Sequence, residues 1–426
     1  MLFRKKETVP VVFAVLLIMF CGGSFSQAAV DLYVDVSKGA GRKVAIGVPA
    51  FEGDPVLGAK AAEIMSHDLE FSGYFKTVSP GAVSGDAAAG AFGDWLGAGA
   101  ELLVLGEVEK GSEIKVQCRL YDIKLREQIL GKALSGSSGL FRKMVHRFSD
   151  EIVERVTGKQ GIAQTRLAFV SNITGHKEIY VVDYDGYNPR RVTRAHSLAT
   201  APTWLPGNRQ IAYTSYRDNN PDLCVKDVLG GSPQRICSFQ GLNYGISFAP
   251  GGKEYAITLS KDGNSEIYAF SIDGKTSRRL TENPRVDCSP SWSPDGRYIA
   301  FTSGRRGGPH LYIMDTSGNM VRRLTASGYN DTPDWSPTGD LIAFSSLRGN
   351  TFDIWVISPD GTGARRLTGG EGDDENPSFS PDGRHIAFSS TRDGNKNIYL
   401  MDIDGSNQTR LTFMKGNAEY PAWSGQ

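Results

Sequence analysis

The feature that most constrains this chain is an internal repeat with a period of about 44 residues. Aromatic residues recur at intervals of 44, 44, 43, 44 and 44 residues, at Trp204, Phe248, Trp292, Trp335, Phe379 and Trp423. A repeat of this length is typical of solenoids and propellers, in which each unit buries its apolar faces only against its neighbours. The chain is therefore expected to contain six stacked units.

Each unit holds four strand signals separated by turn signals. In the last full copy, a Pro-Asp-Gly turn in residues 377–383 precedes two apolar, β-favouring runs at 386–390 and 398–402, and a fourth signal follows at 410–412. The 50 glycines among 426 residues suit a chain with many tight turns. Four antiparallel strands in each unit predict an all-β six-bladed β-propeller with WD40-like repeats over residues 164–426. The recurring aromatic residues should lie between neighbouring blades.

The phase of the repeat predicts how the ring closes. The array opens at residues 167–169, which match the second strand of a unit, and ends at residues 421–424, which match the first. The C-terminal strand should therefore complete the first blade and hold the two ends of the ring together by strand hydrogen bonds.

Residues 1–29 have the pattern of a cleaved signal peptide. Arg4, Lys5 and Lys6 precede an apolar stretch at 9–20, and small residues follow at 26–29. A membrane anchor is the alternative, but a span needs roughly 20 apolar residues. Lipidation at Cys21 is a second alternative, disfavoured by the bulky Met19 and Phe20 before it. We expect an exported, periplasmic protein.

Residues 30–160 lack the repeat and predict a small α+β domain. Helical patterns cover 58–71 and 140–157, strand patterns cover 43–51 and 102–108, and 114–123 with 128–134 form a hairpin. The stretch before the first strand mixes apolar and polar residues and ends near glycines, so it is available to a partner; it contains Val30, Asp31, Leu32, Tyr33, Val34, Asp35 and Val36.

Charge and motifs exclude several functions. Forty-seven basic and 47 acidic side chains give no net charge, which argues against a nucleic-acid partner. No nucleophile elbow, zinc-protease motif or phosphate loop occurs, so neither a catalytic residue nor a cofactor is predicted. Two Asp-x-Asp-Gly stretches, starting at Asp183 and Asp402, lack the later ligands of a calcium loop and are interpreted as turns, so no metal is expected. The expected species is a monomer.

The loops that lead into each first strand should surround one mouth of the propeller channel. They are rich in acids and amides, which predicts a partner with basic or hydrogen-bonding groups. The alternative is that these residues only form turns. The predicted contacts are Asn243, Tyr244, Asp287, Asn330, Asp331, Asp374, Glu375, Asn417 and Glu419.

Two cysteines are a candidate disulfide pair. Cys224 and Cys237 stand at the ends of the third and fourth strand signals of one unit, and a hairpin centred on its turn would place them opposite each other. Reduced, buried thiols are the alternative, since cross-strand bridges have demanding geometry.

The chain as a whole resembles the TolB family, the periplasmic components of the Tol-Pal system. The resemblance rests on the domain order, on residues 166–170 and 183–188, on the Pro-x-Trp-Ser-Pro-Asp-Gly repeats, and on the ending at residues 420–424. It implies a non-enzymatic adaptor that binds the lipoprotein Pal at the propeller mouth and the C-terminal domain of TolA through residues 30–36. It further implies support of outer-membrane integrity and of constriction during cell division.

Two other functions stay open at this point. One is a lyase or hydrolase with its site in the propeller channel, since propellers of such enzymes have similar repeats. The other is a periplasmic scaffold outside the Tol-Pal system, which would bind other outer-membrane or peptidoglycan-associated proteins.

Overall fold

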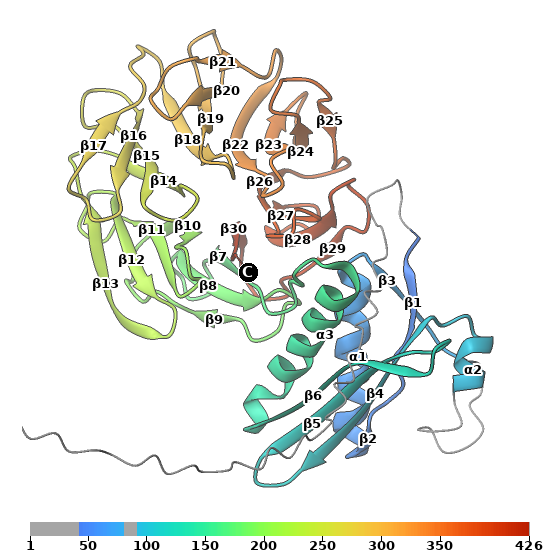
Figure 1. The fold of residues 1–426 in the computed structure, drawn as a ribbon. Coiled ribbons are helices and arrows are strands. Elements are labelled where there is room, and N and C mark those ends of the chain that lie inside the picture. The colour runs from blue at the N-terminus through green and yellow to red at the C-terminus, as the bar shows by residue number, and fades with distance from the viewer. Residues whose placement is uncertain (1–41, 81–91, 426) are drawn as a thin grey trace, which may run out of the picture.

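The computed structural model describes residues 42–80 and 92–425, which form an α+β domain beside a ring of six sheets (Figure 1). The expected fold, an α+β domain followed by a six-bladed β-propeller, is confirmed. The predicted signal peptide and the segment at residues 30–36 lie outside the described residues.

The N-terminal domain is a mixed sheet with strand order β3-β1-β4-β5-β6 and a short β2 paired to β4. The strands are β1 Val44–Gly47, β2 Glu52–Gly53, β3 Phe75–Val78, β4 Leu102–Lys110, β5 Ile114–Asp122 and β6 Glu127–Gly136. The helices are α1 Pro55–Phe71, α2 Phe92–Gly97 and α3 Phe141–Thr157, with a 3-10 turn at Ser138–Leu140. The helices and the hairpin expected from the sequence pattern are present.

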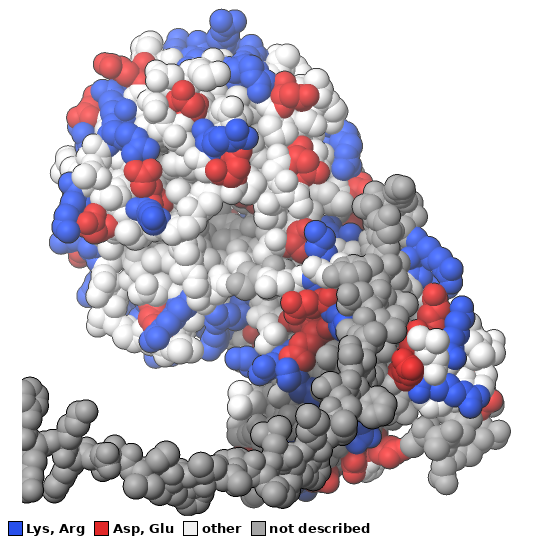
Figure 2. Space-filling model, in the orientation of Figure 1, with Lys and Arg blue, Asp and Glu red and all other residues white. Residues whose placement is uncertain are grey.

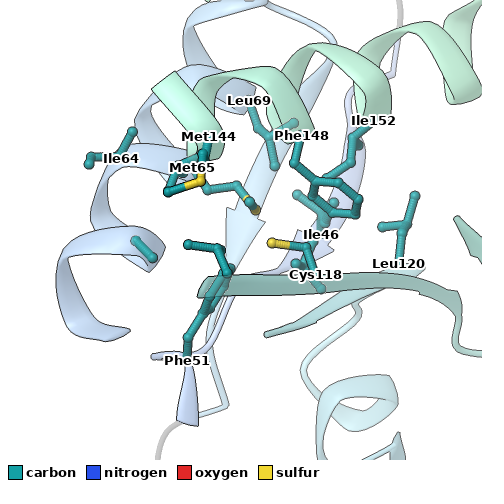
Figure 3. Close-up of a cluster of buried hydrophobic side chains, with 14 of the residues drawn as sticks. Ile46, Phe51, Ile64, Met65, Leu69, Cys118, Leu120, Met144, Phe148 and Ile152 are labelled. Carbon is teal, nitrogen blue, oxygen red and sulfur yellow. The ribbon is translucent and has the colours of Figure 1, made fainter. Parts of the chain in front are cut away.

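Helices α1 and α3 cover one face of this sheet because both bury their apolar sides against it. Figure 3 shows Met65 and Leu69 of α1 meeting Phe148 and Ile152 of α3 over the strands. Fully burying one such side chain contributes about 1.5–3 kcal/mol. The two helices therefore form one layer that turns its outer side towards the propeller.

The propeller consists of six four-stranded antiparallel blades. In ring order their strands are β30 Ala418–Trp423, β7 Arg166–Ser171, β8 Glu178–Asp183, β9 Arg190–Arg191; β10 Ala199–Trp204, β11 Gln210–Ser215, β12 Asp222–Asp227, β13 Gly230–Cys237; β14 Asn243–Phe248, β15 Glu254–Leu259, β16 Glu266–Ser271, β17 Ser277–Arg279; β18 Asp287–Trp292, β19 Tyr298–Ser303, β20 His310–Asp315, β21 Arg322–Arg323; β22 Tyr329–Trp335, β23 Ile342–Leu347, β24 Phe352–Ile357, β25 Arg365–Arg366; β26 Asp374–Phe379, β27 His385–Ser390, β28 Asn397–Asp402, β29 Thr409–Arg410.

The last strand closes the ring as the phase of the repeat predicts. Strand β30 pairs antiparallel with β7, with Ala418 opposite Ser171 and Trp423 opposite Leu167. The indole Nε1 of Trp423 donates to Thr165 Oγ1 at 2.9 Å. The recurring aromatic residues also lie where they were expected, since Trp423 packs in one cluster with side chains of the preceding blade.

The two domains meet through a buried polar cluster and a ring stack. His146 of α3 hydrogen-bonds through Nδ1 to the Asp68 carboxylate at 2.9 Å, and the Tyr184 hydroxyl donates to the same carboxylate. Burial opposes the charged form of His146, but the hydrogen bond and charge of Asp68 raise its pKa. Phe71 stacks on His385 with ring centroids 4.1 Å apart. Because Tyr184 follows the end of β8 and His385 begins β27, the contact lies at the end of the propeller where the first strands finish.

The predicted disulfide between Cys224 and Cys237 is wrong. Both thiols are free, and the strand register places Cys237 opposite Leu223, while Cys224 lies opposite Arg235. An irregularity at this point shifts β13 against β12, so the two cysteines point to opposite faces of the blade. Cys224 accordingly packs in the cluster towards the preceding blade and Cys237 in the cluster towards the next.

Replacing Trp423 by Ala should lower the free energy of unfolding by about 3–5 kcal/mol, because it leaves a cavity at the seam and removes a partner of Thr165. Denaturant titration followed by circular dichroism measures the change. Phe413→Ala is the matched control, since this aromatic side chain is 77% exposed. Equal losses in both variants would contradict closure through β30.

Candidate functional site

The channel of the propeller is shaped by one backbone feature repeated on all six innermost strands. Each of these strands has a register shift at a residue with positive φ, between 50° and 60°. The six residues are Ala201, Gly245, Ser289, Thr332, Asn376 and Tyr420. All but Gly245 precede a proline. Such bulges twist a strand and change the direction of its side chains. Here one bulge in each innermost strand determines which side chains line the channel.

A cavity of about 500 Å³ occupies the axis below these bulges and is lined by all six innermost strands. Tyr244 and Tyr420 both line it, and burial together with the neighbouring Tyr420 raises the pKa of Tyr244. Figure 2 shows the ring hollowed at its centre. The cavity wall is mostly apolar side chains, hydroxyls and prolines.

One carboxylate that the sequence analysis missed lies in this cavity. Asp334 stands where the other innermost strands carry Thr203, Ser247, Ser291, Ser378 and Ala422. Its Oδ2 accepts from the backbone N–H of Phe379 at 2.7 Å, and burial raises its pKa to about 7. Among the described residues that line the cavity, it is the one Asp, Glu, His, Lys or Arg. A paired acid and base would need a second such group, so the wall suits hydrogen bonding more than acid–base catalysis.

Several predicted mouth residues prove to be internal. The prediction that they line an accessible rim is wrong for Asn243, Asp287, Asn330, Asp374 and Glu419, which are 0–6% exposed. Their side chains hold the mouth loops from within. Asn243 Nδ2 donates to the carbonyls of Pro221, Phe239 and Gly241, and its Oδ1 accepts from Phe239 N at 3.0 Å.

The buried carboxylates are neutralised by basic residues on the turns after the second strands. Asp287 accepts from Arg305 at 2.7 Å, and Asp374 accepts from Arg392 at 2.9 Å. These arginines belong to a series with the period of the repeat, namely Arg217, Lys261, Arg305, Arg348 and Arg392. The regular spacing of these basic residues is the sequence signal from which partners of the buried carboxylates could have been predicted. The mouth is therefore mixed in charge, not acidic.

The remaining predicted residues are partly exposed and connect neighbouring blades. Asp331 Oδ1 accepts from Ser289 Oγ of the preceding blade at 3.2 Å. Lys396 Nζ lies 2.6 Å from Glu375 and 3.8 Å from Glu419 of the next blade, and Asn417 Oδ1 accepts from its backbone N–H. Together with Tyr244 these side chains form a polar network around the top of the channel.

Exposed apolar side chains surround this network and were not predicted. Phe239, Val286 and Phe413 lie on the mouth loops, Tyr329 begins β22, and Ile173 lies on the β7–β8 turn at the same end of the propeller; their side chains are 40–77% exposed. Tyr329 meets Phe352 edge to face, with centroids 5.8 Å apart. Large apolar side chains gathered on an exposed surface beside polar groups are typical of a protein-binding site.

Comparison with known proteins identifies close relatives of this architecture. A family model described as the TolB beta propeller domain matches residues 153–426, and one described as the TolB amino-terminal domain matches residues 32–129. The Tol-Pal system protein TolB of Desulfosudis oleivorans is 38% identical over 217 residues, covering 48% of this chain and 49% of that protein. The corresponding protein of Syntrophotalea carbinolica is 40% identical over 165 residues, covering 37% of this chain and 38% of that protein.

A solved structure supports the same relationship over a greater length. The crystal structure of TolB from Acinetobacter baumannii superposes with a TM-score of 0.79 at 28% sequence identity, covering 93% of this chain and 100% of that one. By sequence, the chain spans about half the length, or less, of the two curated relatives described above.

Removing the buried acid of the mouth should destabilise the propeller itself. Asp287→Ala leaves the Arg305 guanidinium, whose side chain is 20% exposed, without its carboxylate. The expected cost is about 3 kcal/mol of unfolding free energy, measured by denaturant titration. Glu63→Ala breaks an exposed pair with Lys60 and should leave stability unchanged. An unchanged Asp287→Ala protein would show that the ion pair is unimportant.

Proposed function

The chain belongs to the TolB family, and we propose that it acts as a non-enzymatic periplasmic adaptor that binds Pal at the propeller mouth and TolA through its N-terminal segment. The names of the relatives assign them to the Tol-Pal system. In this role the protein supports outer-membrane integrity and constriction during cell division. The observation that carries the proposal is a mouth with exposed apolar side chains around a polar network.

The position of the mouth supports binding of a protein partner. The N-terminal domain contacts the propeller near Tyr184 and His385, at the end where the first strands finish. The mouth loops lead into the first strands and therefore lie at the other end. Among the described residues, the mouth is left uncovered and can receive Pal while the two domains stay in contact.

The chemistry of the mouth indicates how binding energy and specificity are divided. Phe239 and Tyr329 can insert into a partner and exclude water, as aromatic anchors do in most interfaces. Glu375 and Asp331, beside basic residues such as Lys396, provide both signs of charge, which orients a partner more than it adds affinity. Figure 2 likewise shows acidic and basic side chains interspersed over the face in view.

Export agrees with the described part of the chain. Within residues 42–80 and 92–425, none of the helices has the length and apolar character needed to cross a membrane. The proposed signal peptide at residues 1–29 would direct the chain to the periplasm, where Pal and TolA are proposed to meet it.

Tyr329→Ala and Phe239→Ala should each weaken binding to the periplasmic domain of Pal about tenfold, because each removes an exposed aromatic contact. Isothermal titration calorimetry measures the affinity, and the melting temperature should stay the same. Met320→Ala is the matched control, since Met320 is 75% exposed on a turn at the opposite end of the blade. Loss of affinity in the control alone would move the Pal site away from the mouth.

Deleting residues 30–38 from the full-length mature protein should abolish its capture of the TolA C-terminal domain in a pull-down with purified proteins. The same variant should bind Pal with unchanged affinity, because the proposed Pal site lies on the propeller. Capture of TolA at the original level by the shortened protein would contradict the assignment of this segment.

A further inference from the structure

One blade departs from the others at a position where the repeat carries a large aromatic ring. The third strands hold Tyr180, Tyr268, Tyr312, Trp355 and Tyr399 at equivalent positions, at the spacing of the repeat. In the second blade this position is Cys224. The side chain that fills the space between blades is therefore much smaller in this one blade.

In four of the other five blades the ring supports a basic side chain from the turn after the second strand, whereas the first blade carries Ile173 at that position. Lys261 lies 4.7 Å from the ring centroid of Tyr268, Arg305 lies 4.9 Å from that of Tyr312, and Arg392 lies 4.8 Å from that of Tyr399. Arg217 is the equivalent residue of the second blade. Because Cys224 replaces the ring there, Arg217 lacks the aromatic face that its counterparts have.

Two further replacements fall on the same face of the same blade. Tyr213 stands where the other second strands carry Phe169, Ile257, Phe301, Phe344 and Phe388. Lys226 stands where the other third strands carry Val182, Phe270, Met314, Ile357 and Met401. The strand register places Tyr213 opposite Cys224, and Lys226 lies two residues further along the same face. At these three positions the second blade thus carries a phenol, a thiol and an ammonium in place of the aromatic or aliphatic side chains of the other blades.

A cavity of about 350 Å³ lies where these exceptions meet. Tyr213, Ser215 and Cys224 form its inner wall, and Thr193 of the preceding blade faces them. A volume of this size is within the range of small-molecule sites. The cavity shares no lining residue with the axial channel.

The charges around the cavity favour an anion. Its lining includes four basic residues, Arg194, Arg217, Lys226 and Arg235, and two acidic ones, Asp218 and Asp222. Both acids lie beside Arg235, at 3.6 Å and 3.1 Å. Arg194 and Arg217 have no ion pair among the residues that the structure describes, and both are exposed at the edge of the cavity. Two guanidinium groups are thus available to an incoming carboxylate.

We propose that this cavity binds an aromatic carboxylate, either a free small molecule or the C-terminal aromatic residue of a peptide. The ring occupies the space that a tyrosine or tryptophan ring fills in the other blades, beneath the Arg217 guanidinium. The carboxylate pairs with Arg217 and Arg194 at the opening, and the Tyr213 hydroxyl offers a hydrogen bond within. This site does not depend on the proposed binding of Pal or TolA.

The test measures binding of 4-hydroxyphenylacetate to the full-length mature protein by calorimetry and by NMR titration. The expected result is saturable binding that acetate and p-cresol, each with only one of the two groups, do not reproduce at the same concentration. A tripeptide ending in tyrosine with a free carboxylate, compared with its amidated form, distinguishes the two sources of the ligand.

Matched variants connect the binding to the cavity. Cys224→Tyr restores the aromatic residue of the other blades and should reduce binding at least tenfold, whereas Cys224→Ser keeps the space open and should bind like the original protein. Arg217→Ala, an exposed substitution, should weaken binding even if the tyrosine variant folds poorly. No binding of either the small molecule or the peptide, or full binding by a folded Cys224→Tyr protein, would overturn the proposal.

Discussion

The pairing of β30 with β7 is the interaction on which the rest of this structure depends. A single four-stranded blade has two apolar faces and cannot bury both alone, so six blades must stack around an axis. An open stack would leave two unburied faces and a strand edge. Here the C-terminal strand supplies the innermost strand of the first blade, and Trp423 fills the seam against the preceding one. The hydrogen bond from its indole to Thr165 extends this closure to the residues that join the domains.

The closed propeller has two faces, one at each end of its channel, and they have different roles. One end is covered in part by α1 and α3 through the cluster of Asp68, His146 and Tyr184. The other end keeps its loops uncovered by the described residues. Buried pairs such as Asp287 with Arg305 hold these loops in place, so that the exposed aromatic groups are presented on a rigid frame. Rigid presentation lowers the entropic cost of binding a partner.

Because the six blades share one residue pattern, positions at which a single blade departs from that pattern can be identified. Among the described residues that line the axial cavity, Asp334 is the one carboxylate, at a position where other blades carry hydroxyls or a methyl group. Cys224, Tyr213 and Lys226 are exceptions that meet in one inter-blade cavity. In a repeat protein each blade provides the reference for the next, so a substitution that opens a space can be recognised without comparison to another chain. At such positions one blade can form a binding site that the other blades lack.

Periodicity and local turn chemistry predict the number of blades, the closing strand and the two long helices of the N-terminal domain from the sequence alone. The sequence could not determine which acids and amides of the mouth are buried. Asn243 and Asp287 look like surface loop residues until the loops fold over them and their own side chains satisfy the enclosed backbone and guanidinium groups. It also misplaced Cys237, because one irregularity in β13 moves a side chain to the other face of the sheet. The cavity beside Cys224 was decided only by tertiary structure, since a small residue leaves a space only if the surrounding chain does not collapse into it.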